Sequence, residues 1–213
     1  MEEAGFVRLS EEWRNALDGP LTSDELHTVI TKERPKGPRT FQDTGNTIKD
    51  DWLDLFLQMF VPGNLTEQQK RGVVVCIPKT TRPTQPSDYR PITLLNTDYK
   101  ILARLVANRM RPTLEELLHP SQFCGRPGST IFEALATVRE AVAVVEVNRK
   151  PLCILTLDFS DAFVRISHHY LFAILLSYGF SKTFVDRIRH MYTNASSVVQ
   201  INGNLSALFP IQC

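Results

Sequence analysis

Two carboxylates stand at the end of an apolar run in the sequence LCILTLDFSDAFVRISHHYL, residues 152–171. Asp158 follows the apolar residues directly, and Asp161 comes three positions later. Leu152 to Leu157 show no alternation of apolar and polar residues, which predicts a strand covered on both faces. An ionised carboxylate at the end of such a strand is costly unless a positive charge meets it. Carboxylate oxygens suit Mg²⁺, so the pair is a candidate half of a divalent-metal site.

A purely structural role explains the same two residues. Asp158 can cap a turn, and Asp161 can begin the following helix together with Ser160. The strand alone does not decide between a metal site and a cap. His168 and His169 stand beside the start of that helix, and we interpret them as structural or exposed residues rather than ligands.

A block of basic residues is the second candidate, in a chain whose net charge is only +1. Between Lys70 and Arg111 the only acidic residues are Asp88 and Asp98. The basic residues of the block are Lys70, Arg71, Lys79, Arg82, Arg90, Lys100, Arg104, Arg109 and Arg111. Such a block can follow a phosphate backbone. The alternative is a solvated helix face with a few loop charges.

The elements that must position these residues are predicted to be helices mixed with separated strands, which is an α+β fold class. The chain has 213 residues, 43% of them hydrophobic, which is enough for one sizeable core. Strands are expected at 72–79 and 90–95, as the two arms of a hairpin, at 152–157, and from Ser196 onward with a turn at Asn202-Gly203.

Capping residues predict where several helices begin. They are Thr22 with Glu25, Thr130 with Glu133, Ser167 and Ser181. Another helix is expected to be capped by Thr97 or Asp98 and to be interrupted by Pro112. The helix from Thr130 to Val147 is expected to pack behind the strand 152–157. The opening of the chain, residues 1–20, is polar, and we expect it to be loosely ordered.

Cysteine spacing and the lack of a leader segment favour an intracellular protein. Cys76, Cys124, Cys153 and Cys213 form no C-x-x-C pair, and we expect them to be small buried residues in a reducing compartment. The acidic N-terminus has no apolar h-region, and no apolar run approaches membrane-spanning length. We expect no membrane partner, and either the nucleus or the cytoplasm is compatible with the sequence.

Four stretches together resemble the reverse transcriptase domain of LINE-type non-LTR retrotransposons. They are IPKTTRPTQPSDYRPITLLNTDYKILARLVANRM, LHPSQFCGRPGST, LTLDFSDAFVRISH and VQINGNLSALFPIQC. They occur in the family's order, and the resemblance extends from about Leu21 to Cys213. It implies a right-hand polymerase fold, with fingers at about 21–150 and a partial palm at about 151–213. It also implies RNA-directed DNA synthesis, with an RNA template, a DNA primer, deoxynucleoside triphosphates and Mg²⁺ or Mn²⁺.

The resemblance also assigns roles to individual residues. Asp158 matches the first catalytic, metal-binding aspartate, with the Phe159 carbonyl as a second metal ligand and Asp161 as a further possibility. Phe163 matches the aromatic residue that excludes a 2′-hydroxyl, although core packing explains a phenylalanine equally well. The residues matched to the incoming triphosphate are Arg90 and Lys79, and those matched to a loop near the template are Arg126 and Gly128. A fork-shaped guanidinium and an ammonium on two arms of one hairpin suit a phosphate chain. For Lys79 the alternative is a solvated strand end.

The sequence departs from the family in three places. Asp161 stands where the family has lysine, and Val164 stands where it has aspartate. The family's PGPDG element survives only as KGPRTFQDTG. The family's arginine-glutamine-glycine motif and its paired aspartates would follow IQC and are not in these 213 residues. We therefore expect a fragment of a polymerase domain that is inactive alone and does not hold a metal tightly. The alternatives are a repurposed module that binds nucleic acid or protein on the same fold, and a partial gene product without function.

We predict that these 213 residues, expressed alone, do not extend a primer on an RNA template with Mg²⁺ or Mn²⁺. Metal ions supply much of the rate of phosphoryl transfer, and one aspartate with a backbone carbonyl cannot hold two of them. The measurement is incorporation of labelled nucleotide. Template-dependent incorporation that disappears in Asp158→Ala would contradict the prediction.

Overall fold

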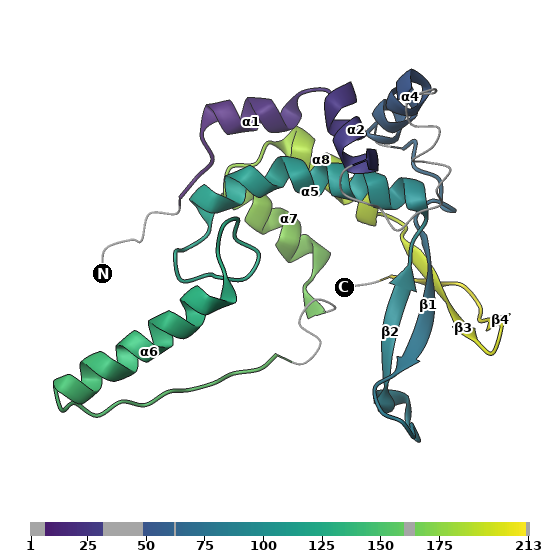
Figure 1. Ribbon diagram of the computed structural model, residues 1–213. Coiled ribbons are helices and arrows are strands. Elements are labelled where there is room, and N and C mark those ends of the chain that lie inside the picture. Colours follow the sequence, from purple (N-terminus) through teal and green to yellow (C-terminus); the bar gives the residue numbers. More distant parts are fainter. Residues whose placement is uncertain (1–6, 32–48, 62, 160–164, 212–213) are drawn as a thin grey trace.

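The computed structural model describes residues 7–31, 49–61, 63–159 and 165–211. These ranges form a mixture of helices and strands, as the sequence predicts (Figure 1). The helices are α1 (Glu11–Asp18), α2 (Ser23–Thr31), α4 (Lys49–Met59), α5 (Thr97–Leu117), α6 (Ile131–Val147), α7 (His168–Ser177) and α8 (Lys182–Tyr192). The strands are β1 (Arg71–Pro78), β2 (Tyr89–Leu94), β3 (Ser196–Ile201), β4 (Asn204–Leu205) and β5 (Phe209–Pro210).

Helix α5 is the centre of the hydrophobic core. Its buried side carries Ile101, Leu102, Leu105 and Val106, and α1, α2, α4, α7 and α8 contribute the other buried residues. Each of these helices presents a stripe of apolar residues at helical spacing, and burial of the stripe holds the helix in place. Helices from before and after residue 150 therefore share one core.

The sheet lies at one end of this helical body (Figure 1). Its order is β2-β1-β3-β4, with β5 also paired to β3. Strand β1 is antiparallel to β2 and parallel to β3. Gly72 makes this close pairing possible, because a Cβ there would lie 2.5 Å from Thr93 Cγ2 and 2.9 Å from Ser197 Oγ.

The predicted capping residues Thr22, Thr130, Ser167 and Ser181 are confirmed, whereas the N-cap of α5 is Asn96 rather than Thr97 or Asp98. Thr22 and Glu25 bond reciprocally at the start of α2, and Thr130 and Glu133 do so at the start of α6. The hydroxyls of Ser167 and Ser181 accept hydrogen bonds from backbone amides at the starts of α7 and α8. The hairpin of β1 and β2 and the Asn202-Gly203 turn between β3 and β4 also form as predicted.

Pro112 does not interrupt α5, contrary to the prediction. The helix is continuous from Thr97 to Leu117, and its N-cap is Asn96. A proline inside a helix removes one backbone hydrogen bond. Here the turn that follows it carries Thr113 and Leu117, which are both buried, so that packing holds the two halves in line.

The predicted strand 152–157 is wrong. Residues 150–159 have no regular secondary structure, and their side chains are exposed, with Leu155 at 76% and Leu157 at 70%. A strand needs a hydrogen-bonding neighbour. Within the described ranges, the sheet consists of β2, β1, β3, β4 and β5, and the apolar run pairs with none of these strands. Sequence alone shows that a run is apolar, not which strand will pair with it.

Helix α6 does not pack behind that run, which is a second correction. It has the predicted bounds, but none of its residues is buried, and it extends away from the helical body (Figure 1). Phe132 and Val147 are 77% and 84% exposed. The helix is held by its own hydrogen bonds and its capping box rather than by tertiary contacts. None of the helices in the described ranges is both long and apolar enough to cross a membrane.

Two further expectations also differ from the structure. Cys76, Cys124 and Cys153 are exposed free thiols rather than buried residues, because they lie at the outer end of β1, in a loop and in the unpaired segment; Cys213 is outside the described residues. Residues 9–18 are packed against the core rather than loosely ordered. Leu9 is buried, and α1, which follows it, buries Leu17.

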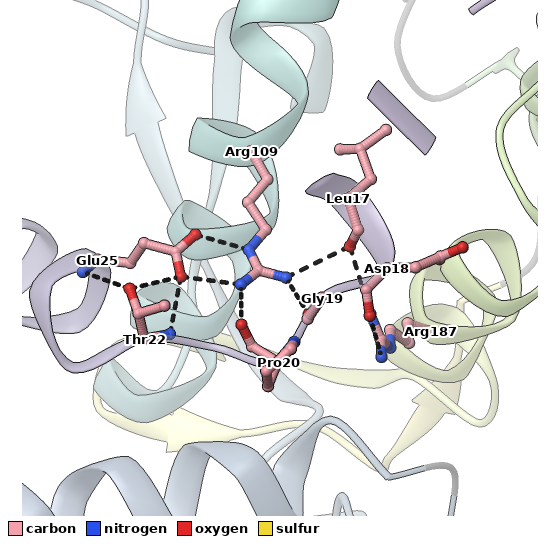
Figure 2. Close-up of polar contacts among 8 residues, drawn as sticks. All are labelled: Leu17, Asp18, Gly19, Pro20, Thr22, Glu25, Arg109 and Arg187. Carbon is pink, nitrogen blue, oxygen red and sulfur yellow. Dashed lines mark hydrogen bonds and ion pairs between the residues drawn. The ribbon is translucent and has the colours of Figure 1, made fainter. Parts of the chain in front are cut away.

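Arg109 joins α5 to the connection between α1 and α2 (Figure 2). Its Nε and Nη2 donate to the two carboxylate oxygens of Glu25 at 2.7 and 2.8 Å. The same guanidinium also donates to the carbonyls of Leu17, Gly19 and Pro20. Burial raises the pKa of the Glu25 carboxyl, and the hydrogen bonds from Arg109 and Thr22 more than offset this, so the pKa lies below its usual value. One side chain therefore supplies hydrogen-bond donors both to the carbonyls at the end of α1 and to the Glu25 carboxylate at the start of α2.

We predict that Arg109→Ala lowers the free energy of unfolding by about 3 kcal/mol, because it leaves a partly buried carboxylate and backbone carbonyls without a donor. Arg109→Lys keeps the charge but loses the forked guanidinium, so its free energy of unfolding should lie between those of the unaltered protein and Arg109→Ala. Arg111→Ala, two residues along on the exposed side, is the control and should change stability by less than about 0.5 kcal/mol. Urea unfolding followed by circular dichroism measures all three. Equal effects of the changes at 109 and 111 would exclude this role.

His190 on α8 holds the turn that follows α4. Its Nε2 lies 3.1 Å from the amide nitrogen of Gly63 and 3.3 Å from that of Leu65. Both amides are donors, so this ring nitrogen must be an unprotonated acceptor. Burial lowers the pKa of His190, and the charge of Lys70 lowers it further.

Because the folded pKa lies below the unfolded one, the unfolded chain takes up a proton first as the pH falls. His190 therefore supports full stability above its unfolded pKa of about 6.5 and loses that support progressively below it. We predict that His190→Gln, which keeps a side-chain acceptor, flattens the fall in unfolding free energy between about pH 7 and 5. The exposed His169→Gln is the control and should leave the slope as it is. An unchanged slope in His190→Gln would show that another group carries the dependence.

Candidate functional site

The β1–β2 hairpin places Lys79 and Arg90 on the same face. Arg90 pairs directly with Ile77 in the antiparallel register. The ladder continues one step further, since the Lys79 amide donates to the Asp88 carbonyl at 2.7 Å. Lys79 lies two residues beyond Ile77, and side chains of alternate residues share a face. The two cations are therefore diagonal neighbours across the strands, within reach of one ligand.

The tip of the hairpin is held in shape by Asp88. Its Oδ2 accepts hydrogen bonds from the amides of Thr84 and Gln85 at 2.9 and 3.0 Å. These backbone bonds, from Thr84 and then Gln85, are the main cause of the lowered pKa of Asp88, and Lys79 adds a smaller effect. The carboxylate is thus ionised near neutral pH and keeps the loop closed. No role was predicted for Asp88 from the sequence. The available signal was an acidic residue three positions after Gln85, in a turn just before a strand.

The charged side chains of this hairpin point to solvent. Lys79, Arg82 and Arg90 are all exposed. The Lys79 ammonium donates to the Ser87 carbonyl at 3.0 Å, which fixes it near the tip and leaves its other two protons for a ligand. No ion pair to a carboxylate is found for Lys79 or Arg90 within the described part of the chain. The arrangement can bind an anion such as a phosphate group.

Asp158 and Phe159 lie on the exposed segment 150–159, apart from the hairpin (Figure 1). Phe159 is 78% exposed. Asp161 and Phe163 lie outside the described residues. The structure thus brings together two of the predicted site residues, Lys79 and Arg90, and leaves Asp158 on a separate segment. From the sequence we expected Lys79 and Arg90 to converge near Asp158, and this convergence is not seen here, because the predicted strand 152–157 has not formed.

Arg126 and Gly128 lie in the turn-rich loop between α5 and α6. Gly128 has a φ of +76°, and Gly125 has a φ of +78°, which glycine adopts without strain. The Arg126 guanidinium donates to the Pro120 carbonyl at 3.3 Å and so closes the loop on itself. This bond gives Arg126 a structural role in addition to the predicted contact with nucleic acid.

The basic block is not one patch, because the fold uses some of its members internally. Lys70 is 6% exposed, and its ammonium donates to the Thr193 carbonyl at 2.7 Å. Desolvation lowers the pKa of Lys70. Arg109 is engaged with Glu25, and Arg71 is half-buried. The exposed members are Lys79, Arg82, Arg90, Lys100, Arg104 and Arg111.

The residues described do not fit a bound metal ion. In the described ranges no group of three or more histidine, cysteine or acidic residues is arranged so that it could hold a metal ion. Asp158 offers one exposed carboxylate, whereas a two-metal polymerase site must hold two ions, each through one or two carboxylates together with substrate phosphates. We therefore derive no chemical step through a metal from this structure.

A family model described as "Reverse transcriptase (RNA-dependent DNA polymerase)" matches residues 77–213. The match includes the outer end of β1, the hairpin tip, β2 and the segment with Asp158. It covers more than half of the chain.

Three relatives agree with this match. The chain is 32% identical over 211 residues, or 95% of its length, to the "Transposon TX1 uncharacterized 149 kDa protein" of Xenopus laevis. It is 27% identical over 142 residues to the "Probable RNA-directed DNA polymerase from transposon BS" and, again over 142 residues, to the "Retrovirus-related Pol polyprotein from type-2 retrotransposable element R2DM", both of Drosophila melanogaster. These alignments cover 60% and 67% of the chain. The chain spans 16%, 16% and 13% of the three relatives. The chain therefore belongs to the reverse transcriptase family and is a reverse transcriptase domain of the non-LTR retrotransposon type, as its motifs indicated.

Proposed function

We propose that this chain contributes the phosphate-binding part of an RNA-directed DNA polymerase, with the β1–β2 hairpin as its contact. The observation that carries the proposal is the shared face of Lys79 and Arg90 on a hairpin whose tip is preorganised. Its ligands are the phosphates of an RNA template, a DNA primer or an incoming deoxynucleoside triphosphate. Residues at about 21–150 then act as fingers and those at about 151–213 as part of a palm.

The two cations suit phosphate in different ways. The Arg90 guanidinium can donate two parallel hydrogen bonds to one phosphate group, and the Lys79 ammonium acts as a compact charge. Because Ser87 already holds the ammonium near the tip, less side-chain freedom is lost when a ligand binds. Solvent exposure of both groups lets a large polyanion reach them.

The remaining matched residues have roles that depend on the complete polymerase. We propose Asp158 as a metal-facing carboxylate, with the Phe159 carbonyl and Asp161 beside it, and Phe163 as the filter against ribonucleotides. Arg126 and Gly128 are proposed to lie near the template. Support for these roles comes from family motifs, and Mg²⁺ or Mn²⁺ would need further ligands than the described residues supply.

We predict that the chain binds an RNA–DNA duplex weakly, with little sequence preference, and that its affinity falls steeply with salt because phosphate contacts release counterions. Lys79→Gln with Arg90→Gln should make the salt slope shallower by about two, one for each phosphate contact. Arg139→Gln with Lys150→Gln removes the same charge from exposed positions away from the hairpin and should leave the slope nearly as it was.

Filter binding over a salt series measures the slopes. Absence of binding at low salt, or binding that does not respond to salt, would refute the proposal. Equal salt slopes for the two double variants would show that the hairpin is not the contact with nucleic acid.

A further inference from the structure

A pocket lies between the tip of the β1–β2 hairpin and the turn that joins β3 to β4. Its volume is about 470 Å³, within the range of about 300–1,000 Å³ that is usual for small-molecule sites. Its walls come from both arms of the hairpin, from the hairpin tip and from the end of β3. We call it the tip pocket, and its lining includes Cys76, Pro83, Pro86, Tyr89, Ile201 and Asn202.

The tip pocket lies on the face of the hairpin opposite to Lys79 and Arg90. Arg90 pairs with Ile77 in the antiparallel register, and Tyr89 pairs with the residue after Ile77. Because neighbouring residues of a strand point to opposite faces, Cys76 and Tyr89 point away from the face of Arg90. A ligand in the tip pocket is therefore separated by the sheet from the two cations of the proposed phosphate contact.

The wall of the tip pocket formed by the hairpin tip is rigid without a ligand. The Asp88 carboxylate accepts hydrogen bonds from the backbone amides of Thr84 and Gln85, which fixes the backbone there. Pro83 and Pro86, on either side of these two residues, have a restricted φ. A wall that is already ordered loses little conformational entropy when a ligand binds.

The lining of the tip pocket suits a flat ring without charge. None of the described residues that line it is charged, so nothing in it compensates an ion for lost hydration. The rings of Pro83 and Pro86, the Ile201 side chain and the Tyr89 ring supply apolar surface. Aromatic side chains stack well on flat heterocycles, because both have an extended face of π electrons.

Two polar groups of the lining are available to the edge of such a ring. No hydrogen bond is found for the Tyr89 hydroxyl or the Asn202 carboxamide within the described part of the chain. A carboxamide offers one donor and one acceptor side by side, which match the amino group and the ring nitrogen on one edge of adenine. The same pocket thus has a stacking surface and groups that distinguish one ring from another.

We propose that the tip pocket binds a nucleobase, with its ring stacked on Tyr89 and its polar edge bonded to the Asn202 carboxamide. Adenine fits these groups well, and it belongs either to a free nucleoside or to an unpaired nucleotide of a strand. The inference goes beyond the proposed function, because it concerns the face of the hairpin that carries neither Lys79 nor Arg90.

Three exposed thiols allow the binding to be measured at defined places on the whole chain. Cys76 lines the tip pocket, whereas Cys124 lies in the loop between α5 and α6 and Cys153 lies in the segment 150–159. Adenosine, or an oligoadenylate RNA, should slow the alkylation of Cys76 by iodoacetamide and leave the rates of the other two thiols unchanged. Ribose 5-phosphate, which has no base, should protect none of them. Mass spectrometry of the separated peptides measures each rate.

Two substitutions test the proposed contacts. Tyr89→Leu keeps an apolar side chain but removes the ring, and should raise the ligand concentration that half-protects Cys76 by about tenfold, as expected for one lost stacking contact. Tyr170→Leu removes an exposed tyrosine from α7 and is the matched control. Asn202→Gly removes the carboxamide at a residue whose φ of +50° glycine adopts without strain, and should raise the same concentration by about fivefold.

The source of the base follows from which ligand protects Cys76. Protection by adenosine alone indicates a free nucleoside, protection by RNA alone indicates an unpaired base of a strand, and protection by both indicates a base from either source. The proposal is wrong if neither ligand protects Cys76, if all three thiols are protected alike, or if ribose 5-phosphate protects as well as adenosine. It is also wrong if either substitution leaves the protection unchanged. Such a failure leaves the proposed function intact, because the salt slope of the Lys79 and Arg90 variant measures contacts on the other face.

Discussion

The Arg109 guanidinium is the interaction on which the helical body depends. A helix leaves its last carbonyls without partners, and those at the end of α1 face the interior side of a tight connection to α2. Arg109 from α5 and Arg187 from α8 both donate to this connection, and Arg187 donates to the Leu17 and Asp18 carbonyls (Figure 2). Two charged side chains from different helices thus replace the water that the connection would otherwise need. The bidentate contact with Glu25 then sets the direction in which α2 leaves.

The sheet is tied to the same body by polar contacts around α8. Buried Lys70, just before β1, donates to the Thr193 carbonyl after α8, and the Tyr99 hydroxyl on α5 donates to the Met191 carbonyl. Burial is the main cause that raises the pKa of Tyr99 to about 12, so this hydroxyl keeps its proton. Strand β1 begins beside β3 as a result, and the hairpin extends from a fixed base. The orientation of Lys79 and Arg90 is therefore a consequence of contacts far from them.

Local signals in the sequence predicted local structure well, but they did not predict which distant strands pair with one another. Capping boxes at Thr22 and Thr130 and the turn at Asn202-Gly203 act over three or four residues, so their residues alone specify them. The hairpin followed from two β-branched runs around a proline-rich turn. The burial of 152–157 depends on which strand lies beside it, and no pattern within the run contains that information. The candidate site divides in the same way, since Lys79 and Arg90 share a hairpin, whereas bringing Asp158 to them would require a long-range strand pairing that is not formed.

The net charge of +1 conceals how differently the cations of this chain are used. Arg109 and Arg111 have the same side chain and are separated by one residue, yet they point in directions about 160° apart around α5. One enters the core, where it can be accommodated because a carboxylate and three carbonyls meet it. The other faces solvent, where the described part of the chain offers it no ion-pair partner. Helix phase, rather than the number of basic residues, decides which cations hold the fold together and which remain for a polyanion. A count of basic residues in the sequence therefore overestimates the binding surface, because it includes the cations that are buried or bonded within the fold.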